Sequence, residues 1–184
     1  KIDRAKILWS LSLFGIRLYN FMGRCRILEY VVDVCQLSCD FYNAYPSNQY
    51  PEIMRKAGRP YTCLLIETNC DYFICIPFRS SIRHNEAFLF TNTKRSLSAR
   101  SGLDYKKVVL IKNLSYIDSN TPVVVDNDEY VMMITNVEMI IKEIEDYIKT
   151  YVNHVNGLSV LHKREFLRHY EFSTLPYFHE ILGI

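Results

Sequence analysis

Two apolar runs, Tyr61-Thr-Cys-Leu-Leu-Ile-Glu67 and Tyr72-Phe-Ile-Cys-Ile-Pro-Phe78, follow each other closely in the chain. Both runs are rich in β-branched and aromatic residues, a composition that favours β-strands. The sequence Asn69-Cys-Asp71 between them is typical of a tight turn. Because their apolar character is nearly continuous, we expect the two strands to pair and to be buried on both faces at the centre of a sheet.

Shorter apolar stretches on either side of this pair predict further strands at 26–37, 87–90, 107–112, 122–125 and 130–134. A short helix over 41–45 is expected after a cap at Ser38 or Asp40, and Pro46 would end it. A second short helix is expected over 51–57, closed by Gly58. The sheet is therefore predicted to carry helices in its connections.

The strongest helical pattern lies between Asn136 and Asn156, where apolar residues recur at a spacing that places them on one face. Thr135 and Glu138 have the spacing of a capping box, and Gly157 is placed to stop the helix. Another helix is expected after Ser173-Thr-Leu-Pro176. Together these elements predict an α+β fold, a compact antiparallel β-sheet flanked by helices with one long helix in the C-terminal half.

The chain has 184 residues, a length typical of one domain. Its net charge is +2, but the charge is unevenly distributed. Residues 79–112 carry eight basic and two acidic side chains, whereas 113–150 carry two basic and eight acidic ones. This polarity indicates either a localised anion-binding face or two stretches that form salt bridges with each other.

The N-terminal segment, residues 1–26, reads differently from the rest. A basic start is followed by about ten apolar residues, too few to span a bilayer, and no small-x-small cleavage site follows. We interpret 1–26 as an extension outside a single domain at 27–184. A docked amphipathic helix is the alternative.

The six cysteines show no C-x-x-C pairing and no histidines at zinc-site spacing. Some of them stand inside the apolar strand runs, where a free thiol behaves as a small hydrophobe. We therefore expect free thiols and a reducing compartment, which predicts a cytoplasmic protein. The cysteines are Cys25, Cys35, Cys39, Cys63, Cys70 and Cys75.

Common enzyme signatures are absent: the chain has no phosphate-binding G-x-x-x-x-G-K, no G-x-G-x-x-G, no G-x-S-x-G and no H-E-x-x-H. The sequence Arg79-Ser-Ser-Ile-Arg-His84, directly after the second apolar run, is more informative. Arg79 could hold a phosphate, Ser80 could donate to a phosphate oxygen, and His84 titrates in the range useful for acid–base catalysis. The competing interpretation is a solvated loop with a structural histidine.

Two more segments could add side chains to the Arg79–His84 region. If the two apolar runs pair, Arg59 before the first lies near Arg79 at the end of the second. The later Gly102-Leu-Asp-Tyr-Lys-Lys107 offers a phenol and two lysines, although Asp104 could cap a turn and Tyr105 could be core.

These motifs resemble the toxins of type III toxin–antitoxin systems, in the TenpN branch related to the ToxN and AbiQ toxins. The resemblance runs from about Val34 to the C-terminus. It rests on Arg59-Pro-Tyr61, Ile76-Pro-Phe-Arg-Ser-Ser-Ile-Arg-His84 with Phe88, Gly102-Leu-Asp-Tyr-Lys-Lys107 followed by Val108-Val-Leu-Ile111, Phe166-Leu-Arg-His-Tyr170 and Ser173-Thr-Leu-Pro-Tyr-Phe-His179.

The resemblance implies an endoribonuclease with a strongly bent antiparallel sheet and no metal or other cofactor. It also implies inhibition by a small structured antitoxin RNA whose repeats the toxin processes, and a role in phage defence. Other expected partners are cellular RNA substrates and a toxin–RNA hetero-oligomer, with no membrane partner. Cleavage would proceed by attack of a ribose 2′-hydroxyl on the adjacent phosphate, leaving a 2′,3′-cyclic phosphate.

The resemblance also implies roles for individual residues. Ser80 matches the family's serine at the scissile phosphate, whereas Arg79 stands where the ToxN branch has threonine. Arg59 stands roughly where the family has a catalytic lysine, but arginine is a poor proton shuttle. His84 is therefore the acid–base candidate, and Arg83 a phosphate ligand. The family also has a lysine after the serine, and that position falls near Ile82 in this chain.

The remaining candidates would grip the RNA backbone or stack on a base. They are Ser81, Tyr61, Lys94, Tyr105 and Lys107. Two other functional classes stay open: a non-catalytic RNA-binding regulatory module that uses the same basic face, and a structural interaction domain whose charged halves pair.

Overall fold

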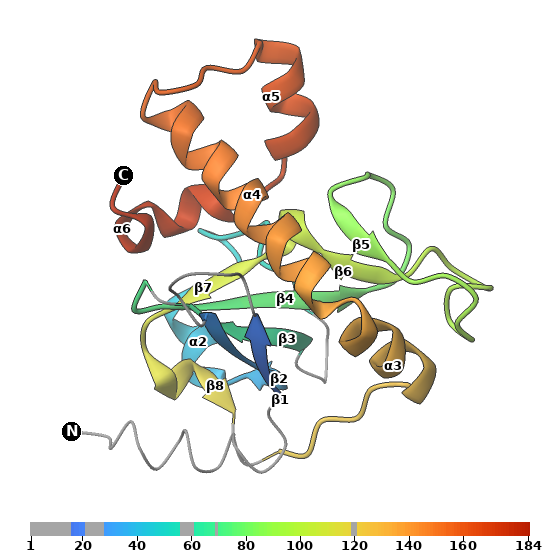
Figure 1. Cartoon of the computed structure of the whole chain (residues 1–184). Coiled ribbons are helices and arrows are strands. Elements are labelled where there is room, and N and C mark those ends of the chain that lie inside the picture. Colours follow the sequence, from blue (N-terminus) through green and yellow to red (C-terminus); the bar gives the residue numbers. More distant parts are fainter. Residues whose placement is uncertain (1–15, 21–27, 56–60, 69, 119–120) are drawn as a thin grey trace.

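The two apolar runs form the centre of the sheet, as predicted. In the computed structural model, which describes residues 16–20, 28–55, 61–68, 70–118 and 121–184, they are strands β3 (Thr62–Glu67) and β4 (Phe73–Arg79). The strands pair antiparallel from Cys63 opposite Pro77 to Glu67 opposite Phe73. Their central side chains are buried. This register places the start of β3 beside the end of β4 (Figure 1).

The long strand β2 (Leu28–Leu37) lies on the other side of β3 and pairs with it antiparallel. Strand β1 (Ile16–Asn20) pairs along the outer side of β2 and so belongs to the sheet, although its residues lie within the segment that we assign to an N-terminal extension. The short β8 (Ile117–Asp118) pairs with the end of β2.

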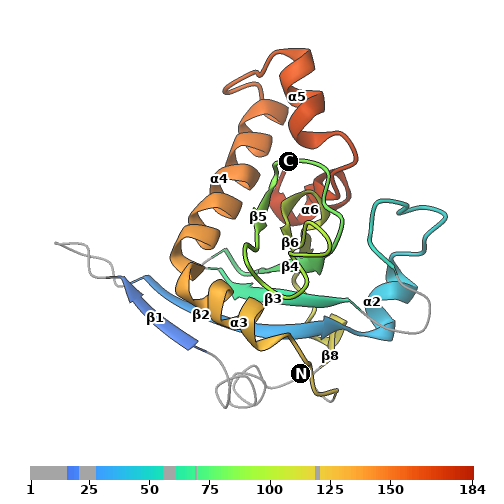
Figure 2. The ribbon, with the colours of Figure 1, turned by 90° about the vertical axis from the view of Figure 1, so that its right-hand side faces the viewer.

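Strand β4 changes partner along its length, and the sheet bends there. Its first half pairs with β7 (Val109–Ile111), and its last two residues pair with β6 (Gly102–Asp104). Pro77, which has no N–H to donate, falls between the two ladders. Strand β5 (Ala87–Leu89) pairs with β6, and Figure 2 shows this pair rising out of the plane of β2 and β3. The α+β fold with a bent antiparallel sheet is confirmed.

Helix α2 (Cys39–Ala44) follows β2 as expected, and the Ser38 hydroxyl caps it by accepting a hydrogen bond from the Phe41 N–H. The helix predicted over 51–57 is wrong for the described part, because residues 51–53 form a turn and bend and 54–55 have no regular structure. The guanidinium of Arg55 donates to the carbonyl oxygens of Tyr42 and Tyr45, which fastens this segment to the end of α2.

Two predicted strands are also wrong. Residues 122–125 have no regular structure, and 130–134 lie within helix α3 (Asn127–Thr135). Glu129 and Met133 of α3 are both buried, and a spacing of four residues puts them on one helix face. The contacts of Glu129 with Arg95 and Ser101 hold this face against the 91–101 loop.

The long helix α4 (Val137–Val155) confirms the strongest helical prediction. Its apolar stripe is buried in the same core as the sheet, and Gly157 ends it with φ +70°. The predicted capping box is wrong, because Asn136 is the cap residue and Thr135 instead donates to the Val131 carbonyl within α3.

After α4 the chain turns back as α5 (Lys163–Tyr170), which the sequence did not predict. The helix expected after Pro176 is present as a 3-10 turn, η3 (Leu175–Phe178), that continues into α6 (His179–Leu182). Figure 2 shows α4 and α5 standing side by side above the sheet. Among the described residues, no helix is long and apolar enough to cross a membrane.

Candidate functional site

A fully buried carboxylate, that of Asp104, organises the end of the sheet where the predicted site residues meet. It lies at the end of β6, opposite Ala87 of β5. Its Oδ2 accepts a hydrogen bond of 2.6 Å from Nη1 of Arg79. Its Oδ1 accepts one of 3.0 Å from the backbone N–H of Lys106 and lies 3.2 Å from Nε2 of His84. Asp104 therefore joins two of the predicted catalytic residues, besides capping the turn as expected.

The environment of Asp104 favours its charged form. Burial alone would raise the pKa of this carboxyl, but the contacts with His84 and Arg79 outweigh burial and hold the pKa below its ordinary value. An ionised carboxylate at this place stabilises positive charge on both partners. The group is thus an electrostatic anchor for a guanidinium and an imidazole.

The His84 side chain is 22% exposed, yet both of its ring nitrogens are shielded from solvent. Nε2 faces Asp104 without the alignment of a hydrogen bond, and Nδ1 has no hydrogen-bond partner among the described residues. A histidine held by a carboxylate on one nitrogen has the other available for proton transfer. Here the ring has to turn before Nδ1 can reach a bound molecule.

The loop between Arg79 and His84 is held at its middle. Ile82 is buried, and its N–H donates to the Arg100 carbonyl. Ser81 has φ +58°, in the left-handed region that non-glycine residues rarely adopt. Ser80 is half-buried, whereas Ser81 and Arg83 are exposed. The loop therefore presents two hydroxyls and a guanidinium beside the Asp104 cluster.

Two predicted residues precede β3. Tyr61 is half-buried and comes directly before the strand, and the β3–β4 register brings this position alongside the end of β4. This confirms the expected proximity of the two strand ends. Arg59 lies outside the described residues.

Other candidates are engaged elsewhere. Tyr105 is buried, and its hydroxyl donates to Oε2 of Glu143 at 2.7 Å, which agrees with the alternative reading of Tyr105 as a core residue. The Lys107 ammonium contacts the Glu52 carboxylate and the Phe172 carbonyl. Lys94 is exposed in the 91–101 loop between β5 and β6, and its backbone N–H donates to Asp128 of α3.

Both readings of the charge pattern hold in part. Arg95 pairs with Glu129 of the acidic stretch, as the salt-bridge reading expects. Lys106 donates to the carbonyls of Arg168 and Glu171. Arg83 is exposed within the Arg79–His84 loop. Lys94 is also exposed, and it lies near α3. The free positive charge is thus smaller than the sequence count indicated.

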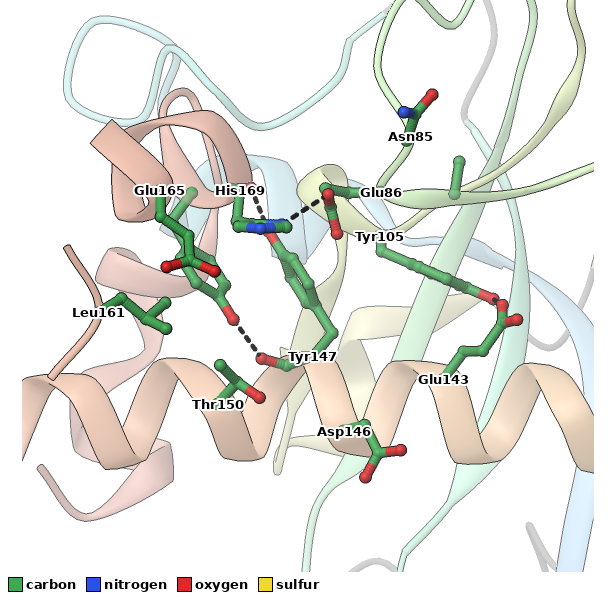
Figure 3. Close-up of a pocket in the computed structure, with 12 residues that line it drawn as sticks. Asn85, Glu86, Tyr105, Glu143, Asp146, Tyr147, Thr150, Leu161, Glu165 and His169 are labelled. Carbon is green, nitrogen blue, oxygen red and sulfur yellow. Dashed lines mark hydrogen bonds and ion pairs between the residues drawn. The ribbon is translucent and has the colours of Figure 1, made fainter. Parts of the chain in front are cut away.

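A pocket of about 390 Å³ lies between α4, α5 and the segment that leads into β5 (Figure 3). Its walls come from 85–87, Tyr105, α4 and α5. Nδ1 of His169 lies 2.7 Å from Oε1 of Glu86, as the figure shows. The Asn85 side chain at the rim follows His84 in the chain, so the pocket adjoins the Asp104 cluster.

Sequence reasoning missed two features of this region. The link from Asp104 to Arg79 and His84 depends on the β4–β6 register, for which the sequence holds no signal. The His169–Glu86 contact joins residues 83 positions apart and depends on α5, which was not predicted. Within the described residues, no three metal-ligating side chains come together as a metal centre.

Comparison with known proteins identifies no relative. No family model, no curated protein and no solved structure matches the chain. The residues around Asp104 and the motifs in the sequence are therefore the features from which a function can be inferred.

Proposed function

We propose that this chain is a metal-independent endoribonuclease of the type III toxin kind, active at the end of β4 and inhibited by a repeat antitoxin RNA that it processes. The observation that carries the proposal is the convergence of Arg79 and His84 on the buried carboxylate of Asp104, with Ser80 next to Arg79 in the chain. The motif resemblance assigns Ser80 to the scissile phosphate and makes His84 the acid–base candidate.

The reaction needs three functions at one phosphate: a base, an acid and fixed donors. A base removes the proton of the 2′-hydroxyl, and the 2′-oxygen then forms a bond to phosphorus while the bond from phosphorus to the 5′-oxygen breaks. An acid gives a proton to the departing 5′-oxygen, and fixed donors stabilise the extra negative charge on the phosphate. The products are a 2′,3′-cyclic phosphate and a 5′-hydroxyl.

In this scheme Ser80 and the exposed Arg83 donate to the phosphate oxygens. Arg79 contributes positive charge, because only one of its nitrogens is engaged by Asp104 and its side chain is 33% exposed. Once RNA binding turns the ring of His84 away from its shielded position, Nδ1 takes the proton of the 2′-hydroxyl as the base, and the resulting imidazolium then gives a proton to the departing 5′-oxygen as the acid. Asp104 stabilises the imidazolium form of the ring during the transfer.

The test is to incubate the purified, RNA-free chain with RNA in excess EDTA and to identify the product ends. Cyclic-phosphate ends are expected from the wild type and are lost in Ser80→Ala and His84→Ala. Ser159→Ala, which removes an exposed hydroxyl in the turn between α4 and α5, is the matched control and keeps full activity. The proposal fails if the chain cleaves no RNA, or if Ser80→Ala and Ser159→Ala cleave equally.

One observation favours a second candidate function, an RNA-binding module without catalysis. Both ring nitrogens of His84 are shielded from solvent, as in a histidine whose role is to hold a loop. This candidate predicts RNA binding that weakens with salt, no cut products, and an affinity that Ser80→Ala leaves unchanged.

A further inference from the structure

We propose that the pocket between α4, α5 and the β5–β6 ladder binds a linear aliphatic polyamine. The inference is independent of the nuclease proposal, because Ser80, Arg79, Arg83 and His84 do not line this pocket, and Tyr105, the one RNA-contact candidate that does, is engaged by Glu143. It rests on the shape of the pocket, on its floor of aromatic rings and on the charges along its rim.

The volume of about 390 Å³ lies in the range of small-molecule sites. Three tyrosines, Tyr105, Tyr147 and Tyr170, are buried beneath it. The Tyr105 hydroxyl donates to Glu143, and the Tyr170 hydroxyl donates to the Tyr147 carbonyl. The Tyr147 hydroxyl contacts the Ser173 hydroxyl and the His169 carbonyl. The rings are therefore fixed and form a rigid floor, and only their small exposed edges can contact the methylene groups of a ligand.

Carboxylates from three separate segments surround this floor. Glu86 comes from the segment before β5, Glu143 and Asp146 come from α4, and Glu165 comes from α5 (Figure 3). No lysine or arginine is among the described residues that line the pocket, and His169 is its one titratable base. Glu86 also faces His169 and Glu143 also accepts from Tyr105, so Asp146 and Glu165 carry most of the attraction for a ligand with more than one positive charge.

The arrangement suits an organic cation better than a metal ion. A divalent ion needs several oxygens within about 2.5 Å of one point. The described residues include no three metal-ligating side chains placed to do this. An alkyl chain with separated ammonium groups can instead meet carboxylates that stand apart, while its methylenes lie on Leu161 and the tyrosine rings.

The experiment is isothermal titration of spermidine into the full chain, freed of RNA because polyamines also bind nucleic acid. We expect saturable binding of one spermidine per chain. In the double variant Asp146→Asn with Glu165→Gln, the affinity should fall about tenfold or more, because each lost carboxylate removes a charged hydrogen-bond acceptor. Circular dichroism checks that the variant is folded.

Glu138→Gln is the matched control, because it removes an exposed carboxylate from the first turn of α4 outside the pocket. It should change the affinity by no more than about twofold. The proposal is overturned if spermidine does not bind saturably, or if the double variant binds as tightly as the control. It is also overturned if Mg²⁺ at equal total charge displaces spermidine fully, since that outcome indicates only diffuse attraction.

Discussion

Arg79 and Asp104 lie 25 positions apart in the sequence, yet Nη1 of the arginine donates to Oδ2 of the aspartate at 2.6 Å. The cause is strand register. Arg79 is opposite Gly102, so Asp104 occupies the diagonal position two residues further along β6, on the same face of the ladder. The long arginine side chain spans that diagonal. The contact thus ties the predicted loop to the bend in the sheet.

Replacing the central carboxylate tests this anchor. Asp104→Asn keeps the size of the side chain but removes its charge, and we expect the free energy of unfolding to fall by about 2 kcal/mol. Urea denaturation measures the change. Arg83→Gln, at an exposed position of the same loop, should alter stability by less than about 0.5 kcal/mol. Equal effects of the two substitutions would contradict the role of Asp104.

Acidification should remove the stabilisation that the Asp104 carboxylate provides. The pKa of Asp104 is lowered in the folded chain from its ordinary value of 3.8. Its stabilisation is therefore fully present above that value and is lost as the pH falls through the lower pKa of the folded state. We expect the stability gap between wild type and Asp104→Asn to be present at about pH 5 and to close in more acidic solution. A gap that widens on acidification would refute this assignment.

Gly102 should not accept a side chain. A Cβ at this position would lie 2.1 Å from the Phe88 carbonyl oxygen and 3.0 Å from the Leu89 Cα. Both contacts are with backbone, so Gly102→Ala must push β5 away from β6, at a cost of about 3 kcal/mol. Thermal unfolding measures the loss. Gly157→Asn, in open space with φ +70°, is the control and should be nearly neutral, because asparagine tolerates the left-handed region.

The buried ammonium of Lys106 should hold the end of α5. It donates to the carbonyls of Arg168 and Glu171, at 2.8 and 3.2 Å. We expect Lys106→Met to lower stability by about 2 kcal/mol and to speed hydrogen exchange in residues 163–170. Lys112→Met, at an exposed position, should leave exchange in α5 unchanged. Unaltered exchange in Lys106→Met would show that other contacts fix this helix.

Thiol reactivity should follow burial. Cys39 and Cys70 are exposed free thiols, whereas Cys35, Cys63 and Cys75 are buried. Burial also raises the pKa of the Cys63 and Cys75 thiols, which disfavours the reactive thiolate. Among the cysteines that the structure describes, mass spectrometry after brief alkylation of the native chain should find Cys39 and Cys70 modified, and Cys35, Cys63 and Cys75 modified only in urea. Early labelling of Cys75 would contradict the structure of the sheet centre.

Local patterns were enough to predict the middle of the fold. The β3–β4 pair, the Ser38 cap and the long helix α4 each depend on residues close together in the sequence, and all three are confirmed. Segment 130–134 reads locally as a strand, but the burial of Glu129 against Arg95 and Ser101 makes it a helix. A contact 34 positions away cannot be read from local propensity.

The candidate site divides in the same way. The sequence by itself determined that Arg79, Ser80 and His84 follow a buried strand, because they are neighbours in the chain and the strand signal is strong. Only the tertiary structure decided that Asp104 holds the arginine and the histidine, and that Glu86 meets His169 beside a pocket. These contacts depend on the register of short strands and on how a helix packs, and both are determined by the whole core rather than by any local stretch of residues.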